Sequence, residues 1–330
     1  MHAGRHYSLK EVAVWTRRET AVFVLVSAVP TAVYVLLGWK WLTIPWLPVA
    51  MVGTAVAFIT GFKNNASYAR LWEARQIWGG IVNSSRTWAI MTLDFIPSAE
   101  AAAGRQRLIH RHIAWLTALR YQLREPRQWE NMRRHHNVEY SRRYRVAEWD
   151  GNLEQELGRL LGESDVSYLN GKKNRAAHLI ALQSRELREL VEQCALSEFR
   201  HVEMERILSA FYDAQGKCER IKNFPYPRQF ATLNLFFTWL FIVLTPFGLL
   251  QEFQKLGDSF VWMTIPASVI VAWVFHTMDK IGEISENPFE GSPNDVPVTA
   301  MSRTIEIDLR QMLGETEIPE ALQPVNNILM

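Results

Sequence analysis

The amino-acid sequence predicts an all-α membrane protein with four spanning helices in each chain. Apolar residues concentrate in the first ninety positions and in residues 230–278, whereas most of the charge lies between residues 98 and 228. Four apolar runs approach the roughly 20 residues that a helix needs to cross a bilayer. Strong helix formers dominate the charged part, and strand-like alternation is nearly absent from it. We expect the membrane helices to continue into a helical body.

The first two apolar runs are expected to form an antiparallel hairpin. The first covers about residues 20–38 and contains Pro30, which should kink the helix. The second covers about residues 45–62 and contains no charged side chain. The loop between them is too short for any other arrangement. Residues 1–19 are polar, with a few apolar side chains close to helical spacing.

Two further runs, at about residues 230–250 and 260–278, predict a second hairpin. Lysine and arginine near the ends of membrane helices mark the cytoplasmic side. Only Lys40 and Lys255 lie on one side of the four predicted spans. Both chain termini are therefore expected in the cytoplasm. Eight basic residues lie on the opposite side: Arg17, Arg18, Lys63, Arg70, Arg220, Lys222, Arg228 and Lys280.

The charged middle of the chain, residues 63–229, is expected to form a cytoplasmic helical body. We treat residues 1–330 as one domain, with an extended, proline-rich tail at residues 286–330 whose one helix covers about residues 302–313. The predicted helices of the body cover residues 102–124, 129–149, 153–161, 174–188 and 190–215.

Composition and motifs argue against an enzyme. The net charge of +2 suggests no nucleic-acid partner, and the two cysteines have neither disulfide-scaffold nor zinc spacing. His110 with His112, and His135 with His136, lack the i, i+3 or i+4 spacing by which two side chains of one helix could share a metal. No phosphate-binding loop, dinucleotide fingerprint or nucleophile elbow occurs. We predict no catalytic residue, no metal and no cofactor.

The second apolar run carries a stripe that suits a pore. Thr54, Phe58 and Phe62 are spaced four apart and share one helical face. Such a face can contact lipid, pack against protein or line a pore. A narrow apolar constriction can select ions by the cost of removing their water, and inward phenyl edges favour anions whereas ring faces favour cations. Enclosing a pore requires several copies of the helix around an axis.

Three motifs resemble the bacterial bestrophin-like proteins. The first, from Gly61 to Gly79, reads GFKNNASYARLWEARQIWG. The second, from Gly216 to Pro227, is similar to the segment before the family's third span. The third, from Asn287 to Pro297, is similar to its tail signature. The motifs occur in the family's order, and the resemblance covers essentially the whole chain.

The resemblance implies a homopentameric ion channel in the lipid bilayer of the bacterial inner membrane. Matching on Gly61 and Phe62 places the family's membrane neck at Thr54, Phe58 and Phe62, and counting back from Gly216 places a cytoplasmic constriction near Phe199. The two phenylalanines favour chloride and other monovalent anions. A monovalent-cation channel, a membrane carrier and a non-conducting scaffold are the alternatives. The near absence of ionisable residues within the spans argues against a proton-coupled carrier.

Arg70, Glu73 and Arg75 follow the neck, and we interpret them as a structural collar. Glu73 lies three residues after Arg70 and could pair with it. Trp72 and Trp78 are interpreted as anchors at the membrane interface.

The tail motif is expected to wrap a neighbouring subunit. Animal members of the family bind calcium through an acidic run at this place. Here the run from Glu290 to Asp295 has too few carboxylates for the several oxygen ligands that calcium takes. We therefore predict no calcium site.

Overall fold

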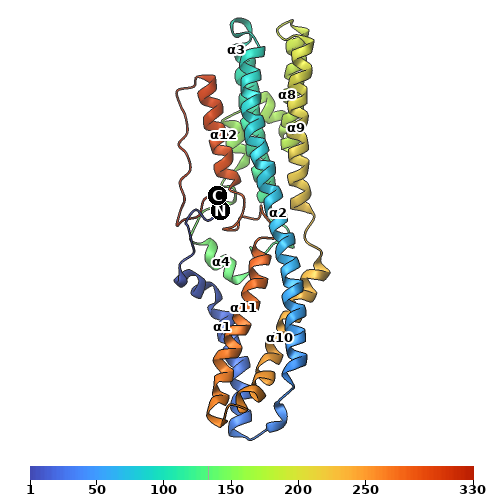
Figure 1. The fold of residues 1–330 in the computed structure, drawn as a ribbon. Helices are drawn as coiled ribbons and strands as arrows, with labels where there is room; N and C mark the ends of the chain where they lie inside the picture. Colours follow the sequence, from blue (N-terminus) through green and yellow to red (C-terminus); the bar gives the residue numbers. More distant parts are fainter. Residues whose placement is uncertain (133) are drawn as a thin grey trace. The chain divides into compact units, whose positions relative to one another are not determined.

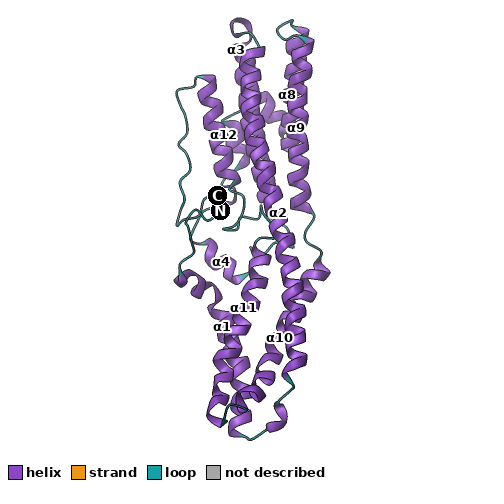
Figure 2. Ribbon diagram, in the orientation of Figure 1, coloured by secondary structure: helices purple, strands orange, loops and turns teal. Residues whose placement is uncertain are grey.

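The computed structural model describes residues 1–132 and 134–330, without the side chains of residues 98–101, 135 and 136. The described residues form helices and no strand, apart from two isolated β-bridges (Figure 2). The all-α prediction is therefore confirmed. The chain divides into two compact units: Gly4–Arg70 with Pro225–Glu286, and Met1–Ala3 with Leu71–Phe224 and Asn287–Met330. The first is called the membrane unit below, and the second the helical body.

The membrane unit contains the four helices that are long and apolar enough to cross a bilayer (Figure 1). They are α1 (Leu9–Leu36), the first part of α2 (Trp46–Phe95), α10 (Arg228–Gln254) and α11 (Thr264–Ile284). Short 3-10 turns, η1 (Lys40–Leu42) and η2 (Asp258–Met263), precede α2 and α11. The four predicted spans are confirmed.

Helix α1 begins well before its apolar run because its first turn is capped. The Ser8 hydroxyl accepts a hydrogen bond from the Glu11 amide (3.2 Å), and the Glu11 carboxylate accepts one from the Ser8 amide (2.8 Å). This reciprocal capping box satisfies amides that a helix N-terminus otherwise leaves without partners. The polar residues before the first span therefore join its helix.

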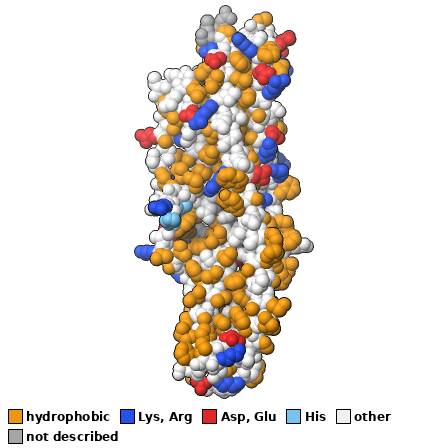
Figure 3. Space-filling view, viewed as in Figure 1, with side chains coloured by type: hydrophobic (Ala, Val, Ile, Leu, Met, Phe, Trp, Pro, Cys, Tyr) orange, Lys and Arg blue, Asp and Glu red, His pale blue; other side chains and the backbone are white. Residues whose placement is uncertain are grey.

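Apolar side chains cover most of the visible surface of the membrane unit, with charges at its end (Figure 3). Its interior combines apolar clusters, such as Phe23 with Ile242, with small polar residues. The hydroxyls of Ser27, Thr31 and Thr245 are buried, and each donates to the carbonyl four residues earlier. At Gly53 a Cβ would lie 2.6 Å from the Phe241 ring, so α2 and α10 approach closely there. Close approach of backbones at small residues, with small polar side chains between helices, is typical of membrane helix packing.

The helical body is built around α3 (Ser98–Arg124), in which residues 111–120 are all buried. The later part of α2 and the helices α8 (Arg175–Glu192), α9 (Glu198–Asn223) and α12 (Val298–Leu313) form the rest of its long helices. Its core holds large aromatic side chains, among them Trp78, Trp88, Trp115 and Phe211. Four short helices complete the body: α4 (His135–Ser141), α5 (Ala147–Asp150), α6 (Leu153–Gly158) and α7 (Glu163–Leu169).

The predicted helix over residues 129–149 is wrong. Among the described residues of this range, only α4 and the start of α5 are helical, because the surrounding chain bonds to the tail instead. The backbone amide of Asn131 donates to Glu290 (2.9 Å), and the Tyr144 hydroxyl donates to the Gly291 carbonyl (2.8 Å). These contacts are distant in sequence, so local helix propensity did not indicate them.

The boundary between α8 and α9 also lies later than predicted. Helix α8 runs to Glu192, and Cys194 then adopts a left-handed backbone with φ of 57°. The amides of Ala195 and Leu196 both donate to the Leu190 carbonyl, which closes the helix end. Ser197 then caps α9. Asparagine and glycine usually take the left-handed position, so a cysteine there gave no signal.

Candidate functional site

The predicted neck residues lie together on the open face of α2. The side chains of Phe58 and Phe62 are 68% and 59% exposed, and Thr54 is also exposed. No other part of the described chain covers this face. The opposite face of α2 is buried, and its residues in the membrane unit are Val49, Gly53, Val56, Thr60, Lys63 and Ser67.

The two phenyl rings pack against each other along the helix. Their centroids are 4.7 Å apart and their planes meet at 87°, which is the favourable edge-to-face arrangement. The Thr54 hydroxyl donates to the Ala50 carbonyl (3.0 Å), so its oxygen keeps lone pairs for water. The stripe is thus apolar at two positions and polar at the third.

A buried ion pair lies directly behind the stripe, and sequence reasoning missed it. Lys63 was expected to mark the exit of α2 into water. Instead its Nζ lies 2.6 Å from Asp279 Oδ1 of α11, and the two side chains are 5% and 3% exposed. The sequence offered one signal for this pair: Lys63 and Asp279 carry opposite charges and each directly follows an apolar run.

The collar residues have separate partners. In the membrane unit, Arg70 Nε donates to the Glu286 carbonyl (2.9 Å). In the helical body, Glu73 forms an ion pair with Arg220 of α9, and Arg75 is exposed. Trp78 is fully buried in the core of the helical body, so its interpretation as an interfacial anchor is wrong.

Phe199 lies in the first turn of α9 and is 78% exposed. The next residue, Arg200, fixes this end of α9 to α2. Its Nη1 donates to the Phe95 carbonyl (3.1 Å), and its guanidinium lies 5.3 Å from the Phe95 ring centroid. A large apolar side chain is therefore held outward from a well-anchored helix end.

The tail motif is buried inside its own chain, which corrects the expectation that it wraps a neighbouring subunit. Asp295 forms an ion pair with Arg124 of α3 (2.7 Å) and accepts hydrogen bonds from the Gly291 amide and the Ser292 hydroxyl. The tail helix α12 begins at Val298, about four residues before its predicted start. The motif thus closes the helical body.

The acidic residues of this motif are used within the protein. Glu290 accepts from the Asn131 amide, and burial raises the pKa of Glu290 well above its usual range. The guanidinium of Arg124 supplies the positive charge beside Asp295. Within the part of the chain that the structure describes, no three histidine, cysteine or acidic residues form a metal-binding group; the side chains of His135 and His136 are outside that part.

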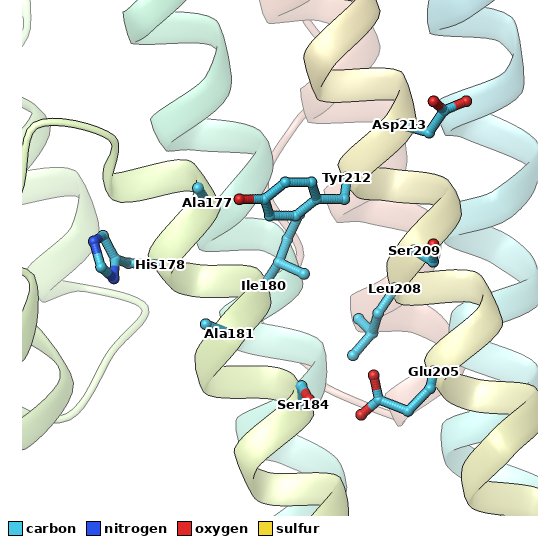
Figure 4. A pocket seen from close by; sticks show the side chains of 10 residues that line it. All are labelled: Ala177, His178, Ile180, Ala181, Ser184, Glu205, Leu208, Ser209, Tyr212 and Asp213. Atoms are coloured by element: carbon cyan, nitrogen blue, oxygen red, sulfur yellow. The ribbon is translucent and has the colours of Figure 1, made fainter.

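A groove of about 570 Å³ lies between α8 and α9 (Figure 4). Tyr212 lies across it from α9 towards α8, with Leu208 and Glu205 beside it on the same helix. Leu208 is nine residues from Phe199, or two and a half helical turns, so these two side chains lie on opposite faces of α9.

Comparison with known proteins gives consistent results. The "voltage-dependent anion channel-forming protein YneE" of Escherichia coli (strain K12) is 28% identical over 277 residues, which cover 84% of this chain and 80% of that protein. A similarly named protein of Ralstonia nicotianae is 28% identical over 273 residues, which cover 82% of this chain and 78% of that protein.

Among solved structures, a bacterial bestrophin homologue from Klebsiella pneumoniae superposes with a TM-score of 0.77 at 26% identity, covering 91% of this chain and 99% of that one. The family profile described as "Bacterial/Fungal Bestrophin protein" matches residues 10–311. The match covers most of the chain, so this protein belongs to the bacterial and fungal bestrophin family.

Proposed function

We propose that this protein is an anion channel of the bacterial inner membrane that passes chloride and other monovalent anions. Membership of a family whose curated relatives are named as channel-forming identifies the chain as a channel rather than an enzyme. The observation that carries the anion proposal is the exposed stripe of Thr54, Phe58 and Phe62 on the uncharged first part of α2. The curated relatives are named as anion channel-forming proteins, which also supports an anion, rather than a cation, as the permeating ion.

The open face of α2 supports assembly around an axis. One chain leaves Phe58 and Phe62 exposed and cannot enclose a path for ions. Copies related by a closed rotation would bring the stripes together and line a pore with them. The family resemblance makes this assembly a homopentamer acting as a single channel domain. Both chain termini then lie in the cytoplasm, as the distribution of basic residues indicates.

The neck would select ions through dehydration and ring electrostatics. A hydrated ion loses water beside Phe58 and Phe62, which costs free energy. Phenyl edges directed at the axis are electropositive, so they stabilise an anion and offset part of that cost. Thr54, at the outer end, provides an oxygen for water before the apolar positions. Phe199 forms a second narrow point in the cytoplasmic part, and Arg70, Glu73 and Arg75 act as a collar that holds α2 to its neighbours.

The neck assignment is tested by Phe58→Ala in planar bilayers. Removing the ring should widen and hydrate the neck, so single-channel conductance should rise and the preference among halides should weaken. Phe236→Ala is the matched control, since Phe236 is a similarly exposed phenylalanine of the membrane unit on α10. Unchanged conductance in Phe58→Ala, or the same change in both variants, would show that the stripe does not line the pore.

A further inference from the structure

The ion pair behind the neck belongs to a buried polar cluster that joins three membrane helices. Lys63 of α2 contacts Asp279 of α11 at 2.6 Å. Asn234 of α10 donates from Nδ2 to the same Asp279 oxygen (2.6 Å), and its Oδ1 accepts from the Thr60 hydroxyl (3.1 Å). All four residues are buried. The cluster thus links α2, α10 and α11 through one continuous set of hydrogen bonds.

Stability alone does not explain such a cluster. Removing two charges from water costs several kcal/mol for each ion, and well-packed apolar residues of the same volume often stabilise a protein equally well. The best-supported benefit of buried polar groups is that they select one arrangement among similar ones. Apolar helix faces can slide or rotate with little change in contact, whereas the bonds of Lys63 and Asn234 have one matching geometry.

The position of the cluster connects it to the neck. Lys63 directly follows Phe62, and Thr60 lies between Phe58 and Phe62. Successive residues of an α-helix point about 100° apart, so holding Thr60 and Lys63 inward holds the two phenylalanines outward. The next residue adds a further restraint: Asn64 Nδ2 donates to the Met278 carbonyl of α11 (3.1 Å).

We propose that Thr60, Lys63, Asn234 and Asp279 are positioning residues that set the rotation of α2, and thereby determine which of its side chains face the ion path. This inference rests on the proposed function, because it assumes that α2 lines the pore. It assigns a role in selectivity to residues that do not themselves touch the ion.

The test measures the rotation of α2 directly. Single cysteines replace Phe58, on the stripe, or Ala57, beside it, in full-length protein carrying Cys194→Ser and Cys218→Ala. Reaction with a charged, water-borne thiol reagent is followed through the current in bilayers, using oligomers isolated by size exclusion. In the parent, the reagent should react faster at position 58 than at position 57.

Each cysteine is then combined with changes in the cluster. Lys63→Met with Asp279→Asn removes both charges and keeps an acceptor for Asn234. Thr60→Val is a milder change of almost the same shape. We expect the ratio of the reaction rate at position 58 to that at position 57 to fall about tenfold in the first variant and less in the second. The reason is that a rotation of α2 by about half the angle between neighbouring residues would move the stripe off the pore axis.

Two controls separate rotation from general damage. Lys63→Arg keeps the charge pair and should keep the parent ratio. Lys255→Met breaks an exposed ion pair with Glu252 in the same unit and should have no effect. Parent ratios in both Lys63→Met with Asp279→Asn and Thr60→Val would overturn the positioning role while leaving the neck assignment intact. If neither position reacts in the parent, the neck assignment fails, and the positioning role fails with it.

Discussion

Acid should destabilise the helical body through His112. This residue of α3 is fully buried between Trp88, Trp115 and Phe211. Its Nε2 lies 2.8 Å from the Ser85 hydroxyl, which itself donates to the Ile81 carbonyl. Nε2 must therefore carry the hydrogen. Nδ1 is buried and has no hydrogen-bond partner among the described residues, so a proton there would be a charge without an acceptor.

The size of the effect follows from the pKa. Burial lowers the pKa of His112 from 6.5 to about 3. Below pH 6.5 the unfolded chain binds a proton at this histidine, whereas the folded chain does not. The free energy of unfolding therefore decreases as the pH is lowered from 6.5 to about 3. Each pH unit in this window costs about 1.4 kcal/mol, which makes about 2 kcal/mol at pH 5.

The assay is thermal unfolding of purified protein in detergent between pH 7.5 and 5.0. For a unit of this size, a loss of about 2 kcal/mol lowers Tm by about 4–8 °C. His112→Phe should lose that share of the pH dependence, although it also loses the bond to Ser85. His201→Gln, on a partly exposed histidine, is the control. Identical pH slopes in the wild type and in His112→Phe would refute the reasoning.

Three further predictions concern buried contacts and calcium. Arg124→Met should destabilise the helical body by about 3–5 kcal/mol, because it leaves the buried carboxylate of Asp295 without its cation. The control Arg145→Met, which breaks an exposed pair with Asp150, should cost under about 1 kcal/mol. Equal melting temperatures for the two variants would contradict this prediction. Gly282→Ala should reduce the yield of folded oligomer, since the new Cβ would lie 2.0 Å from Asn64 Oδ1. Adding Asn64→Ala should restore the yield, and no rescue would show that this contact is not the cause. Micromolar calcium should leave open probability in bilayers unchanged relative to chelator, and activation by calcium would overturn the prediction that the tail binds none.

The parts of the fold that local sequence controls were predictable. Spans at about 20–38, 45–62, 230–250 and 260–278 follow from long uncharged apolar runs, and the structure has helices at all four. The expected continuation of a membrane helix beyond its apolar run is seen in α2, although its end at Phe95 was not predicted. The spacing of Thr54, Phe58 and Phe62 also placed them on one face, and that face is open.

The parts that long-range contacts control were not predictable. Chain segments near Asn131 and Tyr144 leave the helical conformation because they bond to the tail, about 150 residues later. The tail motif was expected to wrap a neighbouring subunit, yet Asp295 pairs with Arg124 in the interior of its own chain. Lys63 looked like a membrane boundary because its partner, Asp279, lies on another helix.

The ion that this channel passes is tested most directly by a reversal potential. Purified oligomers would be placed in a planar bilayer under a potassium chloride gradient, and the voltage of zero current would be measured. An anion channel predicts reversal near the chloride equilibrium potential. Reversal near the potassium equilibrium potential would keep the pore and contradict its anion selectivity, and confirmed oligomers without any current would contradict the channel itself.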